Sequence, residues 1–113
     1  MHELSVAQGI VEACIQHAGG ARVLRVTVEI GTLSCVMHEA LQFSYELAAE
    51  GTLLEGASLE IIRVAARSRC RDCGASIEMN DILSRCICGS ANLEPPLGGD
   101  ELQIKSMEIL EAA

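Results

Sequence analysis

Two short stretches, Cys70-Arg-Asp-Cys73-Gly74 and Cys86-Ile-Cys88-Gly89, contain four of the six cysteines of the chain. In a turn of this kind both thiolates point at one ion, and a glycine after the second cysteine permits the positive φ that the turn requires. Two facing turns supply four thiolates to a closed tetrahedral site. The segment therefore predicts a structural zinc site, which also stabilises its small fold. Its ligands are Cys70, Cys73, Cys86 and Cys88.

The second pair is Cys-x-Cys, which is one residue shorter than the usual Cys-x-x-Cys. Three alternatives to zinc therefore remain: a rubredoxin-like redox iron, a set of reactive thiols, and a disulfide pair. The segment contains no His, so only a four-cysteine shell is expected. A closed site has no open position for water, and this indicates a structural rather than a hydrolytic metal.

Length and composition bound the rest of the chain. Its 113 residues and 12.0 kDa suit one domain with a small insert, and the 50% hydrophobic content is enough for a core. The formal charge of −8 and the presence of only two aromatic residues, Phe43 and Tyr45, argue against a nucleic-acid surface. No apolar run is long enough to span a membrane, and no secretory leader is visible, so we expect a cytoplasmic protein. In that compartment Cys14 and Cys35 should be small buried residues.

The periodicity of apolar residues predicts helices and strands on both sides of the cysteine segment. A first helix should begin at a capping box of Ser5 and Gln8 and end at Gly19-Gly20. A second helix over 36–50 should have an apolar stripe of Ala40, Phe43 and Leu47, with Met37, Leu41 and Ala48 beside it. Strands are expected over 23–30, 59–64 and from Leu102 to about Leu110.

Apolar residues on both faces of 59–64 favour a position near the sheet centre. The final apolar stretch could also be a helix, but it is short and follows a loop. As a strand it needs a sheet, and the cysteine segment is too small to provide one. We therefore expect an α+β fold with two helices on a small three-stranded sheet. The cysteine segment is inserted into that fold as a zinc-knuckle domain.

The amino terminus, Met1-His2-Glu3, forms a second candidate metal site. A His at position 2 places an imidazole beside the terminal amine of Met1 and its own backbone amide. Amine, amide and imidazole nitrogens together suit a tetragonal site, which favours Ni(II) or Cu(II). His17 and His38 have simpler structural interpretations, at the end of the first helix and the start of the second.

Taken in order along the whole chain, these motifs resemble the HypA/HybF family of nickel metallochaperones. The amino terminus matches through Met1-His2-Glu3-Leu4-Ser5, and the centre through Glu29-Ile30-Gly31 and Glu39-Ala40-Leu41. The two cysteine turns match apart from the shortened second pair, and the carboxyl end matches through Gly99-Asp100-Glu101-Leu102.

The resemblance implies a nickel chaperone of [NiFe] hydrogenase maturation rather than an enzyme. Nickel would be bound through the Met1 amine, His2 and the backbone of Glu3, and structural zinc would be bound by the four clustered cysteines. The nickel-binding α+β domain would comprise residues 1–66 plus 99–113, and the zinc-binding domain residues 67–98. A maturation GTPase and the hydrogenase large subunit would be the partners, with neither nucleic acid nor membrane among them.

Two other functions are compatible with parts of the sequence. A zinc-ribbon module for protein or nucleic-acid interaction would account for the arginines around the cysteines, which are Arg63, Arg67, Arg69, Arg71 and Arg85. A rubredoxin-like electron carrier would be coloured, and colour alone separates it from a zinc protein.

Overall fold

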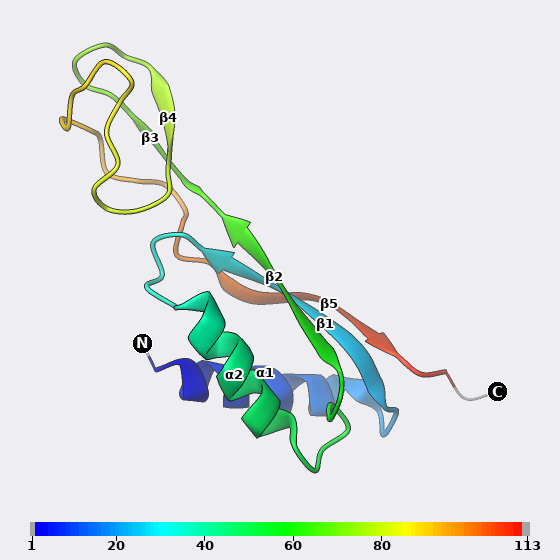
Figure 1. The fold of residues 1–113 in the computed structure, drawn as a ribbon. Coiled ribbons are helices and arrows are strands. Elements are labelled where there is room, and N and C mark those ends of the chain that lie inside the picture. Colours follow the sequence, from blue (N-terminus) through cyan, green and yellow to red (C-terminus); the bar gives the residue numbers. More distant parts are fainter. Residues whose placement is uncertain (1, 112–113) are drawn as a thin grey trace. The chain divides into compact units, whose positions relative to one another are not determined.

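The computed structural model describes residues 2–111. This part of the chain forms two helices, a three-stranded sheet and a two-stranded hairpin, which are labelled in Figure 1. The elements in chain order are α1 (Glu3–Ala18), β1 (Val23–Gly31), α2 (His38–Ala49), β2 (Ser58–Val64), β3 (Ala66–Arg69), β4 (Ser76–Met79) and β5 (Leu102–Ile109). The predicted α+β class, with two helices and a three-stranded sheet, is confirmed.

The strand order of the larger sheet is β2-β1-β5, so β1 is central. The last apolar stretch is therefore a strand, and it joins the sheet predicted for it. The central place predicted for the 59–64 strand is wrong, because β2 lies at an edge. In β2 only Leu59 is buried, whereas Val26, Val28 and Ile30 of β1 are all almost fully buried. Apolar residues on both faces of β2 therefore did not mark a central strand.

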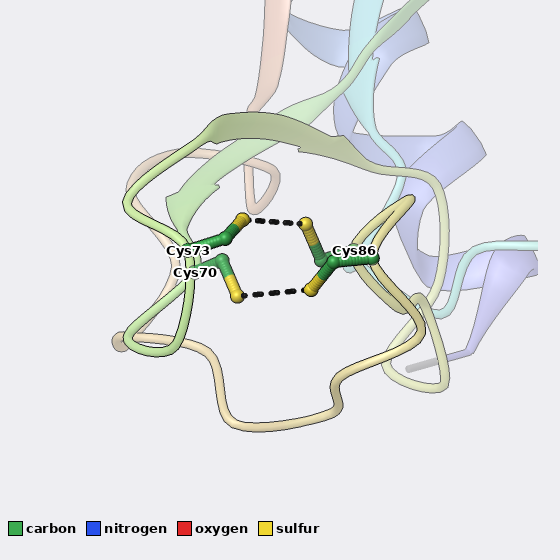
Figure 2. A group of neighbouring side chains, drawn as sticks. Cys70, Cys73 and Cys86 are labelled. Carbon is green, nitrogen blue, oxygen red and sulfur yellow. Dashed lines mark hydrogen bonds between the residues drawn. The ribbon is translucent and has the colours of Figure 1, made fainter.

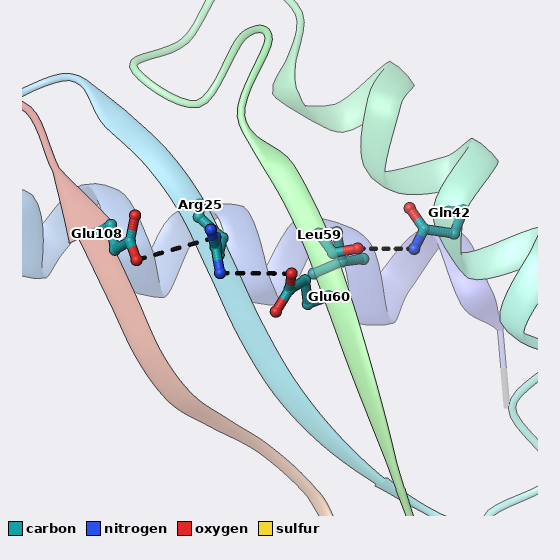
Figure 3. Close-up of polar contacts among 5 residues, drawn as sticks. All are labelled: Arg25, Gln42, Leu59, Glu60 and Glu108. Carbon is teal, nitrogen blue, oxygen red and sulfur yellow. Dashed lines mark hydrogen bonds and ion pairs between the residues drawn. The ribbon is translucent and has the colours of Figure 1, made fainter.

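Two ion pairs connect the central strand of this sheet to its two neighbours. Arg25 of β1 forms both ion pairs (Figure 3). Its Nη1 lies 3.4 Å from Oε1 of Glu60 in β2, and its Nε lies 3.9 Å from Oε1 of Glu108 in β5. All three side chains are about half exposed, so these ion pairs contribute little to stability. They place one cation of the central strand between acidic side chains of the two edge strands.

Helix α1 begins earlier than the capping box predicts. Its N-cap is His2, which makes no side-chain capping hydrogen bond, so the predicted box of Ser5 and Gln8 is wrong. Gly19 ends the helix with a left-handed φ of 60°, as expected from the glycine pair. The buried face of the helix consists of Val6, Ala7, Ile10, Val11, Cys14 and Ala18.

Helix α2 buries a different face from the one expected. The predicted stripe is wrong at Phe43, which is 64% exposed, and at Leu47, which is 49% exposed, whereas Leu41, expected beside it, is fully buried. The buried residues are Leu41, Tyr45 and Ala49, which recur every four positions along the helix. Gln42, next to this face, donates a 2.7 Å hydrogen bond to the carbonyl of Leu59 in β2 (Figure 3).

The two cysteines outside the cluster have different surroundings. Cys14 is buried in α1, as predicted, but Cys35 is exposed, so the expectation of a buried residue is wrong there. Cys35 has a φ of 63°, the only positive value among the non-glycine residues of 2–111. It lies in the connection between β1 and α2, and its Sγ lies 3.8 Å from the carbonyl oxygen of Leu33 rather than in the core.

Tyr45 brings an unbonded polar atom into the core. Its side chain is 2% exposed, and within the described part of the chain its hydroxyl has no hydrogen-bond partner. Burial, together with the nearby Cys14 thiol, raises the pKa of Tyr45 to about 12. The hydroxyl of the folded protein is therefore protonated at neutral pH.

Replacing Tyr45 by Phe should leave the free energy of unfolding unchanged at neutral pH or raise it by up to about 1 kcal/mol, because an unsatisfied buried hydroxyl is removed. The pKa of Tyr45 is raised on folding, so its ionisation does not oppose folding below about pH 10 and increasingly favours the unfolded state as the pH rises from about 10 towards 12. Tyr45→Phe should therefore flatten the alkaline fall in stability. Urea titrations across this pH range measure both effects. A loss of more than about 1 kcal/mol at neutral pH would mean that the hydroxyl has a partner.

The described residues divide into two compact units. Of the described residues, the first unit contains 2–28, 36–62 and 103–111, with both helices. The second consists of residues 29–35 and 63–102 and contains the hairpin and the cysteine turns. No helix in the described part of the chain is long and apolar enough to cross a membrane.

Two glycines allow close backbone contact within the second unit. A Cβ on Gly31 would lie 2.1 Å from the carbonyl carbon of Gly99, and one on Gly99 would lie 2.5 Å from the Cβ of Ala66. The Thr32 hydroxyl also donates a 2.8 Å hydrogen bond to the carbonyl of Met79, at the end of the hairpin. The end of β1 is thereby fixed against the segments on both sides of the cysteine turns.

Candidate metal centre

The four clustered cysteines meet at one point, as the sequence predicts. Their sulfur atoms all lie within 4.8 Å of one another, and Figure 2 shows the two turns facing each other. Cys70 Sγ lies 3.8 Å from Cys88 Sγ, and Cys73 Sγ lies 3.4 Å from Cys86 Sγ. A tetrahedral zinc with Zn–S bonds of about 2.3 Å has S···S edges of about 3.8 Å. The donor set and its spacing therefore fit a four-thiolate zinc ion.

Two backbone hydrogen bonds close the first cysteine turn. The Gly74 N–H donates to the carbonyl of Cys70 at 2.9 Å, and the Cys70 N–H donates to the carbonyl of Ala75 at 2.9 Å. Gly74 has a φ of 76°, in the region that glycine adopts readily. The backbone therefore holds the turn, and the sulfurs of Cys70 and Cys73 point towards the second cysteine turn (Figure 2).

The shortened second turn is closed by the same two bonds. The Gly89 N–H donates to the carbonyl of Cys86 at 2.9 Å, and the Cys86 N–H donates to the carbonyl of Ser90 at 3.0 Å. Gly89 also has a positive φ, of 90°. The missing residue therefore makes the turn one residue tighter, while its closing hydrogen bonds and the convergence of its sulfurs are kept.

The protonation of the cluster is uneven. The backbone N–H of Cys73, and to a smaller degree that of Asp72, lowers the pKa of Cys70 to about 7. The Ala75 N–H lowers the pKa of Cys73, but the Cys86 thiol, burial and the other neighbouring thiols outweigh it and raise the pKa overall. The pKa of Cys70 is therefore below that of Cys73 in the metal-free protein. Metal binding must displace the remaining protons, so zinc affinity should rise with pH.

A polar clasp between the two turns could not be identified from the sequence. The Asp72 carboxylate accepts hydrogen bonds from the Ser90 hydroxyl and from Asn92 Nδ2, the second at 3.2 Å. The hydrogen bond from Ser90 lowers the pKa of Asp72 most, and the bond from Asn92 lowers it further by a smaller amount. Asp72 belongs to the first turn, whereas its partners directly follow the second. No periodic pattern links residues so far apart, so only their proximity in space reveals the clasp.

Replacing Asp72 by Ala should weaken zinc binding about tenfold, because partners that orient metal ligands are typically worth that much in affinity. Asp72→Asn keeps one acceptor oxygen and should lose less. Competition with a chromophoric chelator measures both affinities, with Glu78→Ala as a control on the same hairpin. If Asp72→Ala and Glu78→Ala bind zinc equally well, the clasp does not support the metal site.

The predicted nickel ligands lie at the start of α1. The terminal amine of Met1 lies outside the described residues. His2 is exposed, and the half-buried Glu3 accepts a 3.4 Å hydrogen bond from the backbone N–H of Met37 through its carboxylate. Among residues 2–111, the cysteine cluster is the one group of three or more His, Cys, Asp or Glu side chains close enough to share an ion. His17 and His38 are in the last turn of α1 and at the first position of α2, as expected.

Comparisons with known proteins agree over nearly the whole chain. Residues 1–109 match the family described as hydrogenase/urease nickel incorporation, metallochaperone, hypA. Hydrogenase maturation factor HypA of Nostoc punctiforme is 44% identical over 111 residues, covering 98% of this chain and 97% of the relative. Its counterpart from Rippkaea orientalis is 46% identical over 112 residues, with the same coverage of both chains.

A solved structure supports the same relationship. The solution structure of the Ni metallochaperone HypA from Helicobacter pylori is 29% identical and has a TM-score of 0.66, covering 99% of this chain and all of the other. The resemblance inferred from the sequence motifs is thus confirmed, as is the expectation of a metal carrier rather than an enzyme. The chain belongs to the HypA family of nickel metallochaperones, which act in hydrogenase maturation and carry a four-cysteine site of the zinc type.

Proposed function

We propose that the chain carries Ni(II) at its amino terminus through the Met1 amine, His2 and the backbone of Glu3. The observation that supports this site is the free end of α1. The first backbone amides of a helix have no partner inside it, and the first bond of this type in α1 is from the Val6 N–H to the His2 carbonyl, at 3.1 Å. Nickel can therefore take amide nitrogens of His2 and Glu3 without breaking a helical hydrogen bond.

The contact between Glu3 and Met37 adds support. The Glu3 carboxylate already accepts a hydrogen bond from Met37. The backbone nitrogen of Glu3 is therefore better placed than its side chain to bind nickel. The His2 imidazole makes no capping hydrogen bond to α1 and lies in solvent, so it can turn towards an ion. Both features favour a small nitrogen-rich site at the chain terminus.

We further propose that Cys70, Cys73, Cys86 and Cys88 hold zinc as a structural ion. Zinc supplies a cross-link between two turns that share very few buried apolar residues. In this proposal residues 67–98 form the zinc-binding domain, and residues 1–66 with 99–113 form the nickel-binding domain. Nickel is the cargo, whereas zinc stays with the protein.

The partners in this proposal are a maturation GTPase and the hydrogenase large subunit, which would receive the nickel. The setting is the cytoplasm. All six cysteines are free, and a cluster of four close thiols stays available to a metal only where thiols are kept reduced. The two metal sites would then work in one compartment, with zinc bound before nickel is loaded.

Titration of the untagged, full-length protein with Ni(II), followed by elemental analysis, tests this arrangement. We expect about one zinc per chain as purified and the uptake of nickel without loss of that zinc. Release of zinc in proportion to the nickel bound would place nickel in the cysteine cluster and contradict the two-site proposal. Iron in place of zinc would contradict the structural role.

A further inference from the structure

A surface groove of about 440 Å³ lies beside the cysteine turns, entirely within the second unit. Its lining includes Ile82 and Leu83 from the segment after β4, together with Leu93 and the Pro95-Pro96 pair. Ile82 and Leu83 are 78% and 82% exposed, which is unusual for adjacent large aliphatic residues. The prolines stiffen part of the lining, so little chain entropy would be lost when a ligand binds.

Two arginines, Arg71 and Arg85, also line the groove. Within the part of the chain that the structure describes, the Arg71 guanidinium has no hydrogen bond or ion pair, and Arg85 contacts only the carbonyl of Gly89, at 3.4 Å. Glu94 is the one acidic residue of the lining. The groove therefore offers two guanidinium groups against one carboxylate.

The other acidic residues near the groove are engaged elsewhere. Asp81 accepts a 2.7 Å hydrogen bond from the Leu83 N–H, and Asp72 belongs to the clasp with Ser90. Residues 67–97 contain four arginines and four acidic residues, so the whole net charge of −8 lies outside this segment. Within the described range 2–111, neither Arg71 nor Arg85 is paired with a carboxylate, so the two guanidinium groups favour an acidic ligand, although the net charge of the rest of the chain is negative.

We propose that this arginine-lined groove is a docking site for an acidic, apolar peptide segment of a partner protein. An extended segment that alternates carboxylate and aliphatic side chains matches the groove. Carboxylates would pair with Arg71 and Arg85 in the bidentate geometry that guanidinium favours, and a leucine-like side chain would cover Leu83 and Leu93. The groove has no aromatic lining, and its segment has no net positive charge, so a nucleic acid suits it less well.

Docking should also depend on the metal. Arg71 directly follows Cys70, and Arg85 directly precedes Cys86, so each guanidinium is attached to one of the two cysteine turns. The Arg71 N–H donates to the Asn92 carbonyl at 2.9 Å, which ties the first turn to the groove wall. Without a metal to hold the turns together, the two arginines lose their fixed separation. In this respect the inference rests on the proposed zinc site.

The test uses the zinc-loaded, full-length protein and a fluorescent hexapeptide of alternating glutamate and leucine. We expect saturable binding by fluorescence anisotropy, with amide NMR shifts confined to the groove segments. A lysine–leucine peptide and a glutamate–serine peptide should bind at least about tenfold more weakly, because each lacks one half of the match. Equal binding of the lysine–leucine peptide, or shifts centred on α2, would overturn the proposal.

Four variants separate the groove from its surroundings. Arg85→Gln and Leu83→Ser should each weaken the glutamate–leucine peptide at least about fivefold. Arg69→Gln and Ile87→Ser serve as matched controls, because both residues are exposed in the same segment but do not line the groove. Binding that survives both groove variants unchanged would overturn the proposal.

Measuring zinc in every sample keeps failure of the metal site apart from failure of the groove. Chelation of zinc should abolish peptide binding, and zinc re-addition should restore it. If the zinc-loaded protein does not bind the peptide, the proposed docking site is wrong while the proposed metal site is unaffected.

Two further results would assign the groove to another occupant. A dimer in sedimentation that Leu83→Ser dissociates would assign it to a second copy of the chain, and preferential binding of a fluorescent oligonucleotide would assign it to nucleic acid. Either result would replace the proposed partner segment.

Discussion

Replacing His2 by Ala should lower the affinity for Ni(II) at least about tenfold, which corresponds to about 1.4 kcal/mol. The imidazole of His2 is the only one that can close a chelate with the terminal amine and the intervening amide. The side chain is exposed and supports no buried contact, so the variant should fold normally. Calorimetric nickel titration measures the loss, and circular dichroism confirms the fold.

Controls distinguish this site from general metal binding by histidine. His17→Ala, in the last turn of α1, should keep most of the nickel affinity. Acetylation of the terminal amine should weaken binding, because an acylated nitrogen is a poor donor, and acidification should release nickel as protons compete for the imidazole. Wild-type affinity in a folded His2→Ala protein would contradict the amino-terminal site.

Replacing Cys70 by Ala should remove nearly all of the zinc and loosen the hairpin of β3 and β4. Structural zinc stabilises small domains by on the order of 10 kcal/mol, and this segment has few buried side chains to replace it. Cys70 is 1% exposed, and its sulfur is one of four that lie within 4.8 Å of one another, so the variant removes a buried ligand of the cluster. Elemental analysis and amide hydrogen exchange follow the two effects.

Nickel binding should survive in the same variant, because the proposed nickel ligands lie at the amino terminus and outside the cysteine segment. Cys35→Ser is the matched control: that thiol is exposed and outside the cluster, so both metals should stay bound. If Cys70→Ala loses nickel while α1 and α2 remain folded, the two sites are not separate. If it keeps its zinc, the four-cysteine assignment is wrong.

The features that sequence predicted well depend on local chemistry. Paired cysteines followed by glycine have few other uses, so their spacing alone was enough to predict the cluster and its two turns. The glycine pair after Ala18 likewise marked the end of α1. The final strand was placed in the right sheet because its length and the small size of the cysteine segment left no other location.

The errors arose where two interpretations were locally equivalent. Helix α2 has one apolar stripe through Phe43 and Leu47 and another through Leu41 and Tyr45, and both have helical spacing. Only the packing against α1 and the sheet decides which stripe is buried, and periodicity carries no such information. The Asp72 clasp was missed for a related reason, since its partners are close only after the chain has folded.

The matching hydrogen bonds of the two cysteine turns have a consequence for the cysteine spacing that this site accepts. Each turn is defined by how its backbone closes, from the first cysteine to the glycine and to the residue after it. The number of residues between the cysteines is secondary to that closure, as the pair Cys86 and Cys88 illustrates. A one-residue difference in cysteine spacing is therefore compatible with the same turn closure in this chain.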